Sequence, residues 1–122
     1  MRNPSPSPSA PWLVADIGGT HARFGLVSAH GGPVERIASM RCADYAGPDA
    51  ALHAYLTGLA QSAGGSVVPS ALALALAAPV DGDEIALTNS HWRISRSALR
   101  AAFGDVPVHL LNDFEALALA VP

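Results

Sequence analysis

The residues most able to do chemistry near the N-terminus follow an apolar segment. Asp16 lies near the end of the run WLVADI, and the segment Gly18–Thr20 comes directly after that run. Glycines after a buried strand let the backbone approach a phosphate closely, and backbone N–H groups and a threonine hydroxyl can donate to phosphate oxygens. A carboxylate at a strand end can bind Mg²⁺, directly or through water, because hard cations prefer oxygen ligands. The alternative is a hairpin turn that only needs positive φ angles. No Gly-Lys-Ser/Thr follows, which excludes a Walker-type loop.

A second polar pair, Asn112-Asp113, follows the apolar segment Val106–Leu111. Open α/β sheets bind their ligands at the C-terminal ends of strands, where such a pair would lie. The Asp113 carboxylate could accept a proton from an attacking hydroxyl, and the Asn112 amide could hold a neighbouring hydroxyl. The alternative is that Asp113 only caps the helix that follows it.

A third cluster, Thr88–Trp92, places a hydroxyl, an amide (Asn89), an imidazole and an indole within one short segment. Hydrogen bonding and ring stacking by such groups suit sugar recognition. The alternative is a polar loop with Trp92 as its apolar anchor. His30, His53 and His109 have no spacing typical of metal ligands, so we interpret them as surface or satisfied core residues, and no metal cage is predicted.

The elements that must position these groups begin with three short strands. Apolar or alternating segments separated by glycine-rich turns predict strands at 12–17, 23–28 and 34–41, joined as an antiparallel meander. In the third strand, strict alternation would put Val34, Arg36, Ala38 and Met40 on one face.

The periodicity then changes to that of a helix. An apolar stripe at i, i+3, i+4 and i+7 is formed by Leu52, Tyr55, Leu56 and Leu59. Pro48 lies near the predicted start of this helix, and glycines at 64–65 would end it.

The segment 71–78, ALALALAA, is ambiguous, because alanine and leucine favour helices while their strict alternation is typical of a strand. Its short length and flanking prolines favour a buried strand. Four further elements complete the prediction: a short strand over 84–88, a helix capped by Ser95 and closed by Gly104, a strand over 106–111 and a helix over 113–121. The fold class predicted is α/β, with a mixed sheet in which parallel strands follow the meander and helices flank it.

Composition limits the classes of protein. The chain has 122 residues, of which 50% are hydrophobic and 14% charged, and its formal net charge is -3. Such a composition excludes a disordered protein and lacks the basic footprint of a nucleic-acid-binding domain. The single cysteine excludes an internal disulfide framework and fits a reduced, cytoplasmic setting. The longest apolar run, Ala71–Val80, is too short to span a membrane.

The chain is predicted to consist of two parts. Residues 1–11 are rich in Pro and Ser and are expected to be a disordered leader, whereas residues 12–122 are expected to form one domain. The sequence stops at Pro122 soon after the last predicted helix begins, so we expect the chain to be a piece of a longer protein.

Four segments together resemble the N-terminal part of bacterial glucokinases, in that family's order and spacing. These segments are VADIGGTHAR (14–23), AAPVDG (77–82), TNSHW (88–92) and LNDFEA (111–116). The resemblance covers nearly all of residues 12–122 and is far more specific than any one motif. It implies the actin-like ATPase fold, which is ribonuclease-H-like, and makes residues 12–122 the small N-terminal domain, with the second domain missing from this chain.

The resemblance also implies an activity: phosphorylation of glucose at its 6-hydroxyl by ATP, the first step of glycolysis, in the cytoplasm. Asp113 matches the catalytic base of the family, and Asn112 and Asn89 match positions near the sugar. The residues that match the ATP-phosphate loop are Ala15, Asp16, Ile17, Gly18, Gly19 and Thr20. Mg²⁺ would be bound at Asp16, the full-length protein would be a homodimer, and the isolated fragment would be inactive. No membrane and no nucleic acid is expected as a partner of this domain.

One residue departs from the family, which usually has Asn at the position of His21. This departure bears on the geometry of the phosphate loop rather than on the fold. Two alternatives remain open at this stage: a kinase for another hexose or an amino sugar, and a sugar-sensing regulator, for example one fused to a helix-turn-helix domain.

Overall fold

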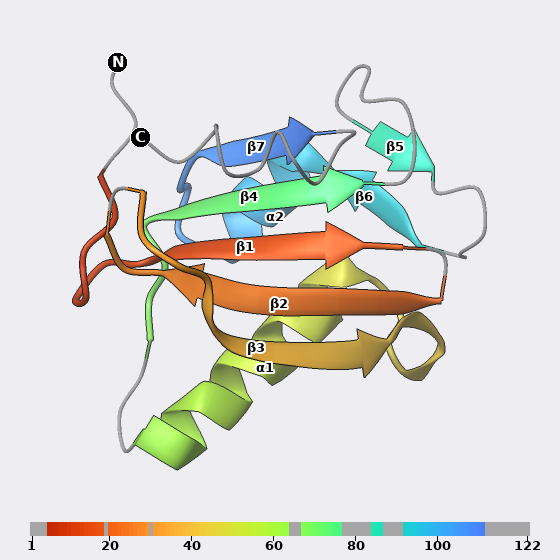
Figure 1. Ribbon diagram of the computed structural model, residues 1–122. Coiled ribbons are helices and arrows are strands. Elements are labelled where there is room, and N and C mark those ends of the chain that lie inside the picture. Colours follow the sequence, from red (N-terminus) through yellow and green to blue (C-terminus); the bar gives the residue numbers. More distant parts are fainter. Residues whose placement is uncertain are drawn as a thin grey trace.

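A computed structural model gives the structure of residues 5–18, 20–29, 31–63, 67–76, 84–86 and 92–111. Within these residues, five strands form a mixed sheet in the order β3-β2-β1-β4-β7, and β5 and β6 form a separate pair (Figure 1). The strands are β1 (Trp12–Ile17), β2 (His21–Val27), β3 (Glu35–Arg41), β4 (Ala71–Leu76), β5 (Glu84–Ala86), β6 (Arg93–Ser95) and β7 (Val108–Leu111). The helices are η1 (Cys42–Asp44), α1 (Pro48–Ala63) and α2 (Arg96–Ala102).

The predicted topology is confirmed. Strands β1, β2 and β3 are joined as an antiparallel meander, while β4 pairs with β1 in parallel and β7 pairs with β4 in parallel. The three parallel strands therefore point the same way and end at the same edge of the sheet (Figure 1). Parallel neighbours need a crossover connection, which α1 supplies between β3 and β4 and α2 supplies before β7.

Strand β4 shows why its alternating sequence forms a strand in spite of its helix propensity. All six of its residues are buried, because β4 lies between β1 and β7 and is covered on both faces. Its leucines, at 72, 74 and 76, belong to the main core, whereas Ala71 and Ala73 face the other side of the sheet. Tertiary burial of both faces thus overrides the intrinsic preference of alanine and leucine for helix.

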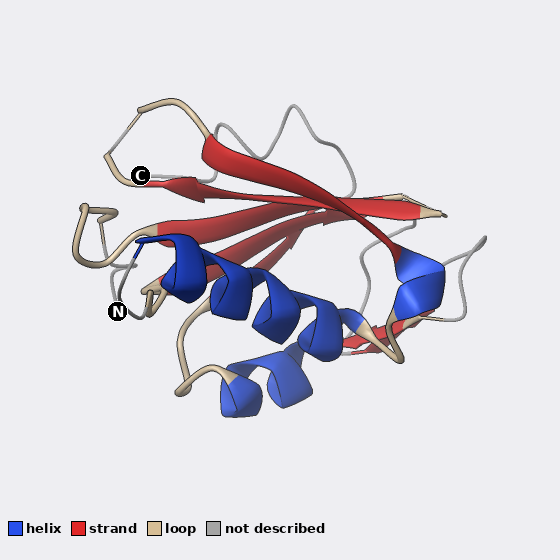
Figure 2. Cartoon of the chain, turned by 90° about the horizontal axis from the view of Figure 1, so that it is seen from below, coloured by secondary structure: helices blue, strands red, loops and turns tan. Residues whose placement is uncertain are grey.

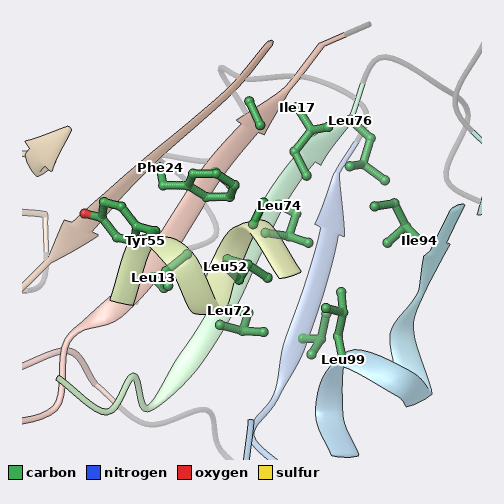
Figure 3. Packing of buried hydrophobic residues seen from close by; sticks show 14 of the residues in the cluster. Leu13, Ile17, Phe24, Leu52, Tyr55, Leu72, Leu74, Leu76, Ile94 and Leu99 are labelled. Atoms are coloured by element: carbon green, nitrogen blue, oxygen red, sulfur yellow. The ribbon is translucent and has the colours of Figure 1, made fainter. Parts of the chain in front are cut away.

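The main core lies between one face of the sheet and the two helices (Figure 2). The predicted helical stripe is confirmed, because Leu52, Tyr55 and Leu59 of α1 are buried against the sheet. The Tyr55 ring lies beside Phe24 of β2, with 5.6 Å between the ring centroids (Figure 3). Leu99 of α2 extends the same core toward β7.

The opposite face of the sheet carries a smaller cluster around Trp12, which is fully buried. Trp12 lies on β1 and stacks on His109 of β7, with 5.2 Å between ring centroids and 7° between ring planes. β4 separates these two strands, so the indole must cross over it. The small side chains of Ala71 and Ala73 leave room for that crossing.

Strand β3 departs from the predicted alternation. The pairing of β2 with β3 shifts between Phe24 and Leu26, and Arg36 adopts a left-handed φ of 54°. This irregularity is a β-bulge, in which extra residues of one strand oppose a single residue of the other. The prediction that Val34 shares a face with Ala38 and Met40 is therefore wrong: Ala38 and Met40 pack against the main core, whereas Val34 contacts Gly25 on the other face.

The cap predicted for the second helix is confirmed. The Ser95 hydroxyl accepts a hydrogen bond from the Ala98 N–H at 3.2 Å, which is the geometry of an N-cap. After α2 the chain turns at Gly104, whose φ of 79° is the left-handed conformation that glycine adopts without strain. β6 was not predicted, and the helix predicted over 113–121 lies outside the described residues.

The N-terminal segment is described from residue 5 onward. Ser7 and Ala10 exchange two backbone hydrogen bonds across a turn, and the Ala10 carbonyl accepts a hydrogen bond from the Ser70 hydroxyl at 2.8 Å. The division into a leader and a domain at residue 11 stays a prediction. Among the residues described, no helix has both the length and the apolar character needed to cross a membrane.

Candidate active site

The register of the parallel strands brings Asp16 and Leu111, the last described residue, to one edge of the sheet. Asp16 of β1 is opposite Ala75 of β4, and Ala75 is opposite Leu111 of β7. Adjacent strands are about 4.8 Å apart, so Asp16 and Leu111 are separated by about 10 Å across the sheet. Asn112 and Asp113 follow Leu111 directly in the sequence, but they lie outside the described residues.

Asp16 has its carboxylate at the surface of this edge. Its side chain is 35% exposed, and its Oδ2 lies 3.9 Å from Nη2 of Arg23, the residue opposite it on β2. Such a distance between exposed groups gives a weak ion pair, so the carboxylate oxygens remain available to a ligand. The flanking Ala15 and Ile17 are buried in the main core, so their side chains position Asp16 and do not face a ligand.

The donor chemistry of Asp16 fits Mg²⁺. In protein sites this ion commonly takes one or two carboxylates and completes its shell with water and phosphate oxygens. Among the described residues, no group of three or more His, Cys, Asp or Glu side chains could hold a metal without such additional ligands. Asp16 would therefore hold the ion together with the phosphates of a nucleotide, not within a cage made by the protein.

The turn between β1 and β2 is closed by its own backbone. The Gly18 N–H donates to the His21 carbonyl at 2.9 Å, so this N–H belongs to the turn and is not free for a phosphate. The φ of Gly18 is not positive, and Gly19 lies outside the described residues. Thr20 is exposed. Among the described residues, its hydroxyl is therefore the predicted donor that remains at the surface.

Cys42 of η1 holds the same turn from the side of the main core, a role that its lone position in the sequence did not suggest. Its N–H donates to the Thr20 carbonyl at 2.8 Å, and its thiol donates to the Gly18 carbonyl at 3.9 Å. Cys42 is 2% exposed and directly follows β3. The meander therefore fixes the loop from two sides, through β2 and through the residue after β3.

A pocket of about 230 Å³ opens on the side of the sheet opposite α1 and reaches the ion pair of Asp16 and Arg23. Its apolar wall is formed by Val14, Val34 and Ile37. The β3 bulge creates this wall, because it turns Val34 and Ile37 to the same side of the sheet. No sequence pattern predicted this pocket.

Trp92 is a buried anchor, not a stacking surface. It is 1% exposed, and its Nε1 donates to the Tyr45 carbonyl at 3.1 Å. Of the two interpretations of Thr88–Trp92, the structure therefore rules out ring stacking on a sugar by this indole. Asn89, the residue predicted to lie near the sugar, is outside the described residues.

The two described histidines away from the loop, His53 and His109, stack on aromatic side chains of the fold. His53 Nδ1 lies 2.9 Å from the Asp49 carbonyl on α1, and its ring stacks on Phe103. His109 stacks on Trp12, and its Nε2 is buried without a hydrogen-bond partner among the described residues. Burial lowers the pKa of His109 below its ordinary value, and the nearby charge of Arg96 lowers it further.

The sequence profile of the glucokinase family matches residues 13–122. The chain belongs to the glucokinase family. The glucokinase of Paramagnetospirillum magneticum is 51% identical over 109 residues, which are 89% of this chain and 32% of that protein. The chain thus spans about a third of the length of this curated relative.

Solved structures of glucokinases have the same fold. The crystal structure of glucokinase from an Antarctic psychrotroph matches 87% of this chain and 33% of its own, with a TM-score of 0.74 and 33% sequence identity. A glucokinase of the ROK family from Streptomyces griseus, solved with glucose and AMPPNP, matches 83% of this chain and 32% of its own. Its TM-score is 0.56 at 19% identity, a likeness of fold alone. These sugar kinases of the actin-like ATPase fold confirm the predicted fold class.

Proposed function

We propose that the full-length protein transfers the γ-phosphoryl group of ATP to the 6-hydroxyl of glucose and that this chain supplies the phosphate loop and the catalytic base. The observation that carries the proposal is the pairing of Asp16, Ala75 and Leu111 across the adjacent strands β1, β4 and β7. It puts the C-terminal ends of β1 and β7 at one edge of the sheet, which is where open α/β sheets bind ligands. Membership of the glucokinase family supports the substrate and the reaction.

The loop after β1 would bind the phosphates of ATP. Thr20 would donate its hydroxyl hydrogen to a phosphate oxygen, and the Asp16 carboxylate would hold Mg²⁺. An ion bound there would neutralise part of the phosphate charge, and phosphoryl transfer requires this neutralisation. The two hydrogen bonds from Cys42 keep the loop in place, so the contribution of these residues is positioning and charge.

The residues after β7 would act on the sugar. Asp113 would accept the proton of the glucose 6-hydroxyl as that oxygen attacks the γ-phosphorus, and Asn112 and Asn89 would hold neighbouring hydroxyls. Leu111 is only about 10 Å from Asp16 across the sheet, so a base two residues beyond it would be within reach of a γ-phosphoryl group held near Asp16.

The remaining features of the proposed function belong to the whole protein. We propose a cytoplasmic homodimer that acts in glycolysis, with further sugar and adenosine contacts from the part of its relatives that this chain does not match. The relative from Paramagnetospirillum magneticum is about three times as long as the matched region. The 122 residues alone are therefore expected to show no turnover, since a kinase cleft needs a second wall to exclude water.

A panel of substrates tests this proposal. The full-length enzyme, incubated with ATP and Mg²⁺, is expected to phosphorylate glucose with a higher kcat/KM than mannose, fructose or N-acetylmannosamine. A preference for one of the other sugars would replace glucose as the substrate. No ATP-dependent phosphorylation of any sugar would overturn the proposal and favour a sugar-binding regulator.

A further inference from the structure

Thr20 and His21 are joined by a side-chain hydrogen bond at the tip of the hairpin between β1 and β2. The Thr20 Oγ1 and the His21 Nδ1 are 3.0 Å apart, and both residues are exposed. Their backbones are fixed independently, because the His21 carbonyl accepts from Gly18 and the Thr20 carbonyl accepts from Cys42. The imidazole is therefore held beside the hydroxyl that would contact a phosphate.

The direction of this hydrogen bond depends on which nitrogen atoms of the ring carry a proton. In a neutral imidazole with its proton on Nε2, the Nδ1 is an acceptor, and the hydroxyl must donate its single hydrogen to it. In the protonated ring, Nδ1–H is a donor, and the Thr20 oxygen becomes the acceptor. Only in the second case is the hydroxyl hydrogen free to donate to a phosphate oxygen.

We propose that His21 is a positioning residue that controls where the hydroxyl hydrogen of Thr20 points and thereby sets the affinity of the phosphate loop for ATP. In the neutral ring the proton is on Nε2, so Nδ1 accepts the hydroxyl hydrogen of Thr20. In the protonated ring Nδ1–H donates to the Thr20 oxygen, and the hydroxyl hydrogen is free. This inference rests on the proposed function, because it assumes that the loop binds the phosphates of ATP. It assigns His21 an action through Thr20 and not a direct contact with phosphate.

Charged residues of the sheet lie beside His21. Arg41 of β3 is directly opposite His21, and Arg23 lies two residues along β2 on the same face. Asp16 of β1, opposite Arg23, is an acidic residue that the strand register places beside these cations. The phosphates of ATP would add negative charge beside the ring and favour its protonation. Binding of ATP is therefore expected to be coupled to the uptake of a proton.

The test is the pH dependence of the KM for ATP in the full-length enzyme, measured between about pH 6 and 8. At saturating Mg²⁺, the KM for ATP is expected to be lower at pH 6 than at pH 8 by about 2- to 10-fold, the effect of one hydrogen bond. The KM for glucose should not follow this change. The variant His21→Asn cannot titrate, so its KM for ATP should vary much less with pH.

A second variant separates an action through Thr20 from a direct contact of His21 with phosphate. Thr20→Val keeps the shape of the side chain but removes the hydroxyl, so it should raise the KM for ATP and also abolish its pH dependence. His53→Asn is the matched control, since His53 is exposed on α1 and should leave the profile unchanged. A pH dependence that persists in Thr20→Val would overturn the inference, as would a flat profile in the unmodified enzyme.

The tautomer gives a readout that does not depend on activity. The ¹⁵N–¹H spectrum of the His21 imidazole at pH 8 is expected to show the proton on Nε2, and a proton on Nδ1 would overturn the inference. If the enzyme shows no ATP-dependent turnover at any pH, the proposed function fails and this inference fails with it. Turnover with a flat pH profile would overturn the role of His21 alone.

Discussion

The Tyr55 hydroxyl donates a hydrogen bond to the Arg36 carbonyl at 2.7 Å and so joins the middle of α1 to the bulge of β3. Arg36 is the bulged residue with a φ of 54°, a conformation that costs an L-amino acid about 1–2 kcal/mol. The bulge turns Val34 and Ile37 toward the pocket that reaches Asp16. A contact in the core thus shapes the surface beside the proposed phosphate loop.

Removal of this hydrogen bond should destabilise the fold. Tyr55→Phe keeps the ring in the core but leaves the Arg36 carbonyl without this donor, so the free energy of unfolding is expected to fall by about 1–2 kcal/mol. Arg36→Gly should have the opposite effect, a gain of about 1 kcal/mol, because glycine adopts the left-handed conformation without a Cβ penalty. Urea unfolding measures both changes. Equal midpoints for Tyr55→Phe and the unmodified protein would show that the contact does not stabilise the bulge.

The same tyrosine predicts how stability changes at alkaline pH. All seven residues counted as Lys+Arg are arginines, so no lysine titrates in this range. Burial raises the pKa of Tyr55 from 10.0 to about 12, and the charge of Arg36 offsets part of that rise. The folded state therefore holds this proton more tightly than the unfolded state, and the stability it contributes is full below pH 10 and is lost as the pH rises through about 12.

Unfolding experiments between pH 9 and about 12 check this prediction. The unmodified protein should lose stability more steeply than Tyr55→Phe, which has no phenol to titrate at this position. Parallel curves for the two proteins would contradict the assigned cause.

The lowered pKa of His109 predicts how the stability of the fold changes at acidic pH. Burial and the charge of Arg96 lower its pKa below the ordinary value of 6.5, so the unfolded state binds the proton more readily. The stability contributed by the neutral ring is complete above about pH 6.5 and is lost as the pH falls through the lowered pKa. His109→Phe keeps an aromatic ring against Trp12 and should flatten the curve between about pH 7 and 5. His53→Asn is the control, and an equal flattening in that variant would argue against His109 as the source.

Several parts of the fold could be predicted from local patterns, and the missed parts depend on distant contacts. The two-residue period of Ala71–Leu76 predicted a strand correctly, because it reflects burial on both faces. The bulge at Arg36 could not be predicted, since the partner that stabilises it lies 19 residues away on α1. Alternation alone therefore assigned Val34 to the wrong face.

The candidate site shows the same division. The segment Asp16–Thr20 could be proposed from its residue types, because a carboxylate and glycines after an apolar run are typical of phosphate loops, and its binding of phosphate stays a prediction. The part played by Cys42 depends on the β2–β3 register, which brings its N–H to the Thr20 carbonyl and which no local pattern encodes. The burial of Trp92 also follows from a tertiary contact, its hydrogen bond to the Tyr45 carbonyl.

The role of Asp16 can be separated from that of its ion-pair partner. In the full-length enzyme, Asp16→Asn is expected to shift the Mg²⁺ concentration for half-maximal activity upward by about 10-fold or more, since it removes a charged oxygen ligand. Arg23→Gln removes the neighbouring cation and keeps the carboxylate, so the Mg²⁺ requirement should stay the same or fall. An unchanged requirement in Asp16→Asn would exclude Asp16 as the residue that holds the ion.

The rate of glucose 6-phosphate formation by full-length Asp113→Asn, measured beside the unmodified enzyme, tests the proposed role of this chain most directly. Asparagine preserves the size of the side chain but cannot accept the proton of the 6-hydroxyl. We expect kcat to fall by about 10²–10⁴-fold, as is typical for loss of a general base, while calorimetry shows glucose binding to be largely retained. A rate close to that of the unmodified enzyme would contradict the proposal and leave Asp113 as a helix cap.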